Sequence, residues 1–346
     1  MARIDADIHN VVPSTEALFP YLSDHWRETV TQTLFKGTVD ASYPPRAPTS
    51  ARDGARPAEG PPGSSLEMLR EQVLDPDGVE LGIMACTYAI DGLRNPDAAI
   101  AFARAVNDWQ IAEWLDREPR LRASIVVPSQ LPQEAAREID RVGGHPGFVQ
   151  VVIPARSHLP WGNRIHHPLF EAAARNDKAV ALHFGGAPGN PPTPSGWPSY
   201  YVEEYVDMAT VFASQLTSIV CEGVFDQFPA LRVVLLESGF TWLPAHMWRF
   251  DKEWRNLRRL VPWVRRNPSD YIREHVRVAI QPLDAPPDPK QIAQIVEQLE
   301  CEEMLLYCSD YPHRHAFDAE RDLLAHLPEP LADKIRRENA RAFYRL

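Results

Sequence analysis

Cysteine is scarce in this chain of 346 residues, which contains four. They are Cys86, Cys221, Cys301 and Cys308, and no two of them form a C-x-x-C pair. In a chain of this length, such scattered cysteines do not describe the disulfide framework of a small secreted protein. We therefore expect buried free thiols.

Long runs of apolar or basic residues are also missing. No stretch reaches the roughly 18 apolar residues that a membrane helix needs, and the first residues lack the basic and apolar regions of a signal peptide. The net charge is −11 and no run of Lys or Arg stands out, so the chain lacks the basic patch with which proteins bind nucleic acid. We expect a cytoplasmic protein that binds neither membranes nor nucleic acid.

Apolar residues are plentiful, at 44% of the chain, and many gather in short runs rich in β-branched residues. Eight such runs predict strands. They cover residues 2–9, 79–87, 121–128, 147–155, 179–185, 231–238, 276–282 and 304–310. Several are continuous rather than alternating, which is typical of strands covered on both faces in a parallel sheet.

Segments with helical periodicity lie between most of these runs. The clearest cover residues 97–119, 131–142, 167–177, about 201–228 and 289–300, and a final helix is expected over 329–346. Eight strands alternating with helices in a chain of this length predict an α/β fold of the (β/α)8 TIM-barrel type. Residues 1–346 would form it as a single domain, and a doubly wound open sheet is the alternative.

Residues 31–65 depart from this alternation, because they are rich in Pro, Gly, Ala, Ser and Arg. They follow the first strand, so in a barrel this long insertion belongs to the catalytic face. A loop of this length is either a lid over a site or a mobile segment. Together with residues 186–202 it is expected to cover the mouth, and the Pro, Tyr and Trp content of the two segments suggests a small, partly apolar substrate.

The first strand, IDADIHN, carries Asp5, Asp7 and His9 at every second position. Alternate side chains of a strand share a face, so all three could project to the same side. Burying three such groups is costly unless something pairs with them. A solvated edge strand is the simple explanation, and a metal ion near Asp7 and His9 is the alternative, with Asp5 lying deeper as a supporting acid.

Other polar residues stand at the ends of later predicted strands. His183 ends the fifth strand, Glu237 the sixth and Asp310 the eighth. Singly, such a histidine is more often a hydrogen-bonded rim residue and such an aspartate a helix cap. In a barrel, however, all these strand ends meet on the face where barrel enzymes build their active sites.

Taken together, these positions predict a metal centre. Two imidazoles and two carboxylates converge, a set that suits Zn, Fe or Mn: Asp7, His9, His183 and Asp310. A metal with open positions activates water, and a nearby carboxylate can accept the proton of that water. Asp310 is the first candidate for this base and Glu237 the second, and His183 is included among the catalytic groups. We expect one ion per chain, or two if Glu237 is a ligand for a second.

Three further residues are candidates for substrate binding. His313 follows Asp310 in SDYPHRHAF and could contact the substrate, support the metal site or be an ordinary loop histidine. Arg156 and His158 follow the fourth strand. A guanidinium suits a substrate carboxylate, although a surface role is the more common one for an arginine.

These segments resemble a known family. IDADIH, HPLFEAAARNDKAVALHFGG, LLESGFTWLPAHMWRFD and SDYPH, in this order and spacing, are similar to the amidohydrolase-related branch of the metal-dependent amidohydrolase superfamily. The resemblance implies a distorted TIM barrel, a divalent metal at its C-terminal end, and hydrolysis or non-oxidative decarboxylation. It also places the family's ligands at Asp7, His9, His183 and Asp310.

Two departures from the family pattern affect the expected reaction. Many superfamily members have His-x-His in the first strand, whereas Asp7 here adds negative charge and makes Fe or Mn credible beside Zn. Members that decarboxylate aromatic or enoic acids have a histidine where Glu237 stands, and an anion there would repel a carboxylate substrate. We therefore expect a hydrolase that cleaves an ester, thioester, amide or lactone, with a decarboxylase as the alternative. A homo-oligomer, first of all a dimer, is expected for this kind of barrel.

Overall fold

The computed structural model describes residues 2–38 and 50–346. In this part of the chain, eight parallel strands form one sheet in sequence order. Their bounds are β1 Arg3–Ile8, β2 Val79–Met84, β3 Leu121–Val126, β4 Phe148–Pro154, β5 Ala179–His183, β6 Val233–Leu236, β7 Val276–Ala279 and β8 Leu305–Leu306. Every predicted strand is present. The (β/α)8 barrel is therefore confirmed over the doubly wound sheet, whose strand order would reverse.

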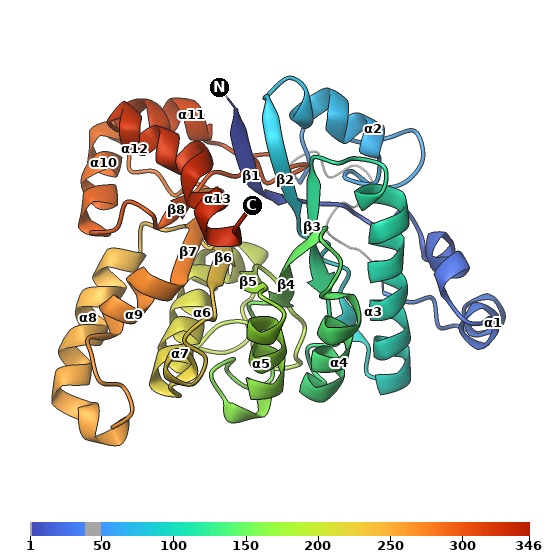
Figure 1. The fold of residues 1–346 in the computed structure, drawn as a ribbon, viewed down its shortest axis with the longest axis horizontal. Helices are drawn as coiled ribbons and strands as arrows, with labels where there is room; N and C mark the ends of the chain where they lie inside the picture. Colours follow the sequence, from blue (N-terminus) through green and yellow to red (C-terminus); the bar gives the residue numbers. More distant parts are fainter. Residues whose placement is uncertain (1, 39–49) are drawn as a thin grey trace.

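The barrel closes between β1 and the segment that follows the short strand β8. The Ala6 amide donates to the Tyr307 carbonyl at 2.9 Å, and the Asp310 amide donates to the Asp7 carbonyl at 3.0 Å. Figure 1 shows β1, in dark blue, between β2 and the orange C-terminal strands. This seam places the predicted metal ligands of the first and last strands next to each other.

Helices lie on the outside of the strands (Figure 1). In the described residues the α-helices are α1 Asp24–Gln32, α2 Leu66–Leu69, α3 Pro96–Gln110, α4 Pro132–Val142, α5 His167–Arg175, α6 Tyr201–Cys221, α7 Val224–Gln227, α8 Leu243–Leu257, α9 Pro268–His275, α10 Pro289–Gln298, α11 Ala319–Asp322, α12 Glu329–Asp333 and α13 Asn339–Tyr344. Each predicted helical segment contains at least one of these helices. The sequence did not predict α1, α2, α8, α9 or α11.

The central strands are buried on both faces, as their apolar runs predicted. All four residues of β6 are 0% exposed, and every residue of β5, including His183 at its end, is buried. Because apolar side chains cover both faces, the backbone polar groups of these strands are paired within the sheet. The polar side chains at the strand ends are therefore attached to well-packed, fully hydrogen-bonded strands.

The insertion between β1 and β2 lies partly over the mouth of the barrel. Of the predicted loop 31–65, residues 39–49 lie outside the described residues. Where it resumes, Ala51 pairs with His313, and the Arg52 amide donates to the Pro312 carbonyl at 2.8 Å. The loop therefore contacts the segment after β8, and its role as a lid or a mobile segment stays a prediction.

All four cysteines are free thiols, as predicted, and Cys86 and Cys308 are buried while Cys221 and Cys301 are partly buried. Across residues 2–38 and 50–346, none of the helices has both the length and the apolar character that crossing a membrane requires.

One buried histidine outside the site predicts how stability depends on pH. His275 stacks on Phe225 with ring centroids 4.4 Å apart, and its Nδ1 donates to the Leu231 carbonyl at 2.9 Å. Burial lowers the pKa of His275 below its ordinary value. The folded state therefore binds a proton less readily than the unfolded state, and stability is lost as the pH falls below about 6.5.

We expect the free energy of unfolding in urea to be smaller at about pH 5.5 than at about pH 7.5. His275→Gln has no imidazole at this position, so its unfolding free energy should fall less over the same interval. An equal fall in the two proteins would show that His275 does not contribute to this pH dependence.

Candidate metal centre

The first strand brings Asp7 and His9 to the mouth of the barrel, with Asp5 beneath them. Asp5 Oδ1 accepts hydrogen bonds from the Ser309 amide at 2.9 Å and from the Asp7 amide at 3.3 Å. Burial raises the pKa of Asp5 to about 6. Asp5 thus joins β1 to the segment after β8, which agrees with the supporting role predicted for it.

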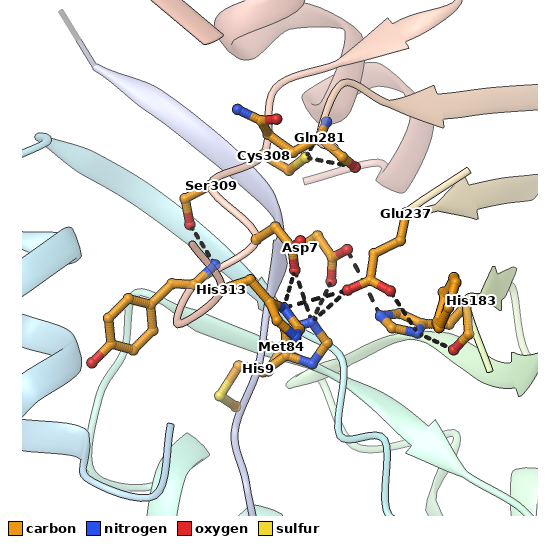
Figure 2. Close-up of polar contacts among 12 residues, drawn as sticks. Asp7, His9, Met84, His183, Glu237, Gln281, Cys308, Ser309 and His313 are labelled. Carbon is orange, nitrogen blue, oxygen red and sulfur yellow. Dashed lines mark hydrogen bonds and ion pairs between the residues drawn. The ribbon is translucent and has the colours of Figure 1, made fainter. Parts of the chain in front are cut away.

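The predicted ligands converge from three strands. Figure 2 shows the side chains of Asp7, His9, His183 and Glu237 pointing toward one another. His9 Nε2 lies 2.9 Å from Asp310 Oδ1 and 4.0 Å from Asp7 Oδ1. His183 Nε2 lies 4.0 Å from Asp7 Oδ2 on the opposite side.

Glu237 stands among three imidazoles. Its carboxylate oxygens lie 3.6 Å from His9 Nε2, 3.8 Å from His183 Nδ1 and 3.4 Å from His313 Nδ1. These rings come from β1, β5 and the loop after β8. The negative charge of Glu237 is therefore surrounded by groups that can carry a positive charge.

Asp310 has the densest set of partners. Besides His9, its carboxylate contacts His313 Nδ1 at 2.9 Å and His315 Nε2 at 3.0 Å. Burial alone would raise the pKa of Asp310, but these imidazoles hold it well below its usual range. The same pairing acts on His9, where burial opposes the charged form and the Asp310 and Glu237 carboxylates raise the pKa well above its ordinary value.

The donor set fits a divalent cation. Asp7 is fully buried, yet neither of its carboxylate oxygens has a hydrogen-bond partner, and His183 Nε2 has none either. Burial raises the pKa of Asp7 well above its usual value, with further increases from Asp310 and Glu237. A buried carboxylate without a partner is costly, and a cation between Asp7 and His183 would supply one.

The orientation of His183 supports the same interpretation. Its Nδ1 donates to the Phe184 carbonyl at 2.8 Å, which leaves Nε2 directed at Asp7. Metal-binding histidines usually donate their second ring nitrogen in this way. Two overlapping groups offer ligand atoms within 4.8 Å of one another, as a site for a divalent metal requires: Asp7, His9 and His183, and His9, Glu237, Asp310 and His313.

Two of these residues have unusual backbones. Glu237 has a φ of 57° and Asp310 a φ of 52°, both in the left-handed region that non-glycine residues seldom adopt. Backbone strain of this kind clusters at functional sites. Glu237 directly follows β6 and Asp310 lies in the segment after β8, and both side chains line the cavity at the mouth.

Above this cluster lies a cavity of about 1060 Å³. Its walls include five of the predicted site residues, which are His9, His183, Glu237, Asp310 and His313. The sequence analysis did not single out four aromatic residues of the same walls, although the segment 186–202 that it expected to cover the mouth includes Tyr201: Tyr88, Phe184, Tyr201 and Tyr205. Tyr201 and Tyr205 belong to α6, and no strand-end signal marks them.

The two residues predicted after β4 do not reach the cavity walls. The Arg156 guanidinium forms an ion pair with Glu204 of α6, so it is already matched by a carboxylate. His158 is exposed on the surface. Neither position supports the predicted contact with substrate.

Fold and site together define a (β/α)8 barrel with a cluster of candidate metal ligands at its C-terminal mouth. The amidohydrolase family profile matches residues 4–346, and the chain belongs to this family. The resemblance noted in the sequence is therefore confirmed.

Among curated relatives, the gamma-resorcylate decarboxylase of Polaromonas sp. (strain JS666 / ATCC BAA-500) is 29% identical over 218 residues. The match covers 59% of this chain and 63% of the relative, which is less than two thirds of its length.

Solved structures of similar fold include two decarboxylases. The 5-carboxyvanillate decarboxylase of Novosphingobium aromaticivorans DSM 12444, complexed with manganese and 4-hydroxy-3-methoxy-5-nitrobenzoic acid, has a TM-score of 0.74 at 20% identity and covers 100% of this chain and 96% of that one. The dihydroxybenzoic acid decarboxylase of Polaromonas sp. JS666, with manganese and the inhibitor 2-nitroresorcinol, has a TM-score of 0.68 at 22% identity and covers 100% and 97%. At these identities the similarity shows a shared fold.

The predicted hydrolysis of an acyl bond is wrong, because the curated relatives are decarboxylases. The prediction rested on repulsion between Glu237 and a carboxylate substrate. In the structure, three imidazoles lie within 3.8 Å of the Glu237 carboxylate. Burial opposes the charged form of His9 and His313, but nearby carboxylates raise the pKa of both above its ordinary value, so these two rings can offset the charge of Glu237. The argument against a decarboxylase therefore loses its physical basis.

Proposed function

We propose that this protein catalyses the metal-dependent, non-oxidative decarboxylation of a hydroxylated benzoic acid, with Mn²⁺ as the metal. The observation that carries the proposal is the Asp310 carboxylate, held by three imidazoles at the mouth of the barrel, in a chain whose curated relatives are decarboxylases. Manganese is bound in the two solved decarboxylases of similar fold.

In this proposal the metal ligands are Asp7, His9, His183 and Asp310. When bound, a divalent ion supplies positive charge that attracts the substrate carboxylate and stabilises negative charge on a neighbouring oxygen. Glu237 lies beside His9 and His183 at 3.6 and 3.8 Å, where its charge keeps the imidazoles in place.

The reaction breaks the bond between the ring carbon and the carboxyl group, releases carbon dioxide and puts a proton on the ring carbon. We assign delivery of this proton to the pair formed by Asp310 and His313. His313 Nδ1 lies 2.9 Å from Asp310 Oδ1, and a quarter of its side chain is exposed. His313 can therefore connect the buried carboxylate to water and restore the proton after each turnover.

The test uses the Mn²⁺-loaded protein with 2,6-dihydroxybenzoate and with 5-carboxyvanillate. We expect equal amounts of carbon dioxide and decarboxylated phenol from at least one of them, at a turnover on the order of 1 per second or faster. Carbon dioxide is measured by gas analysis and the phenol by chromatography. The control is protein stripped by a chelator, and methyl 2,6-dihydroxybenzoate tests for ester cleavage. Methanol release without carbon dioxide from either acid would refute the proposal.

A further inference from the structure

Three aromatic side chains form one continuous wall of the cavity, which we call the aromatic wall: Phe184, Tyr205 and Tyr201. The ring centroids of Phe184 and Tyr205 are 5.1 Å apart, and those of Tyr205 and Tyr201 are 5.8 Å apart. Phe184 directly follows His183, and its backbone carbonyl accepts a hydrogen bond from His183 Nδ1 at 2.8 Å. The wall therefore begins beside the metal ligands.

The aromatic wall becomes more exposed from Phe184 to Tyr201. Phe184 is partly buried, whereas Tyr205 is 51% exposed and Tyr201 is 66% exposed. The two tyrosines stand four residues apart on α6, so they present one face of the helix to the cavity. Rings that stay this open on a cavity wall offer apolar area that a ligand can cover.

The wall is longer than the reacting ring of a hydroxybenzoate. Three rings with centroids more than 5 Å apart offer more aromatic area than a single bound ring can cover. The cavity of about 1060 Å³ also reaches the upper end of the roughly 300–1,000 Å³ found for pockets that bind drug-sized ligands. Adjacent rings of the wall are tilted by 47° and 55°, which suits offset and edge contacts with another ring.

We propose that the aromatic wall binds a second ring of the substrate, so that the substrate is a hydroxylated benzoic acid with an aryl substituent. This inference rests on the proposed decarboxylation, because it places the carboxylated ring at the metal ligands. Tyr205 lies at the centre of the wall and contacts both Phe184 and Tyr201. We therefore expect Tyr205 to contribute most to a preference for ligands with a second ring.

The experiment compares two product-like phenols, resorcinol and 5-phenylresorcinol, by calorimetric titration of the Mn²⁺-loaded protein. We expect 5-phenylresorcinol to bind about tenfold more tightly, since one stacked ring contributes roughly that factor. Tyr205→Ala should reduce the preference to about twofold or less. Trp197→Ala removes an aromatic residue that is 71% exposed and absent from the cavity walls, and it should keep the preference.

Equal affinities for the two phenols, or an unchanged preference in Tyr205→Ala, would overturn the inference. Tyr201→Ala provides a second variant if Tyr205→Ala does not fold, and it should weaken the preference in the same direction. The titration needs no turnover, so it can be separated from the proposed function. A preference for the aryl phenol without any release of carbon dioxide would refute the decarboxylase and leave the aromatic wall supported.

Discussion

Asp310→Asn is expected to lower kcat/KM for decarboxylation by about 10³-fold, within the range of a lost acid–base group. The substitution keeps the shape of the side chain but removes the charge that holds His9, His313 and His315 at 2.9 to 3.0 Å. The proton path through His313 would be lost, and the metal would be bound more weakly. Initial rates of carbon dioxide release, with the metal content of each sample measured in parallel, test this expectation.

The backbone makes asparagine a fair substitute at this position. Asp310 has a φ of 52°, and asparagine adopts the left-handed region more readily than most residues. Asp116→Asn is the matched control and should keep full activity. Asp116 is exposed and precedes β3, so it lies at the end of the barrel opposite the mouth. An Asp310→Asn protein with normal metal content and near-normal kcat/KM would remove Asp310 from the mechanism.

Removal of the metal is expected to lower the melting temperature of the natural protein by about 5 to 10 °C. A ligand at a hundred times its Kd adds about 2.7 kcal/mol, and each kcal/mol corresponds to a few degrees in a chain of this size. Without the ion, the two oxygens of Asp7 are buried without hydrogen-bond partners. The apoprotein would therefore hold an uncompensated buried carboxyl group.

Asp7→Asn should change how the melting temperature depends on the metal. Its melting temperature should respond little to Mn²⁺, because one ligand is lost, but its metal-free form should be at least as stable as the metal-free natural protein, since a neutral amide costs less to bury than a carboxylate. Scanning calorimetry with chelator and with saturating Mn²⁺ separates the two effects. A metal-free Asp7→Asn protein several degrees below the metal-free natural protein would contradict the assignment of Asp7 as a ligand.

The convergence of the candidate ligands could be predicted from the sequence, because the backbone of a strand fixes the direction of each side chain. The alternation in IDADIHN places Asp7 and His9 on one face, and the end of a parallel strand in a barrel has only one location. His183, Glu237 and Asp310 follow continuous apolar runs, so their position at the mouth followed from the identification of the strands. The structure brings all five residues together.

The walls of the cavity depend on loops, and the sequence predicted only that the segments 31–65 and 186–202 cover the mouth, not which side chains line it. Tyr201 and Tyr205 reach the cavity because the chain after β5 returns α6 to the mouth, and no periodicity encodes that path. Arg156 was assigned to the substrate by its place after β4, yet Glu204 on the same helix pairs with it. The reaction was predicted wrongly because the three imidazoles around Glu237 come from segments far apart in the sequence. That they lie close to its carboxylate is visible only in the folded structure.

The left-handed backbones of Glu237, directly after β6, and Asp310, in the segment after β8, limit how this site can be redesigned. At Glu237 and Asp310, with φ of 57° and 52°, glycine, asparagine and aspartate are the residues that the main chain accepts most readily. A β-branched side chain at either position would be strained at this φ, so the loop would have to move to accommodate it. New activities in this scaffold are therefore more accessible through the aromatic residues of α6, whose helical backbone accepts many side chains, than through the two carboxylates.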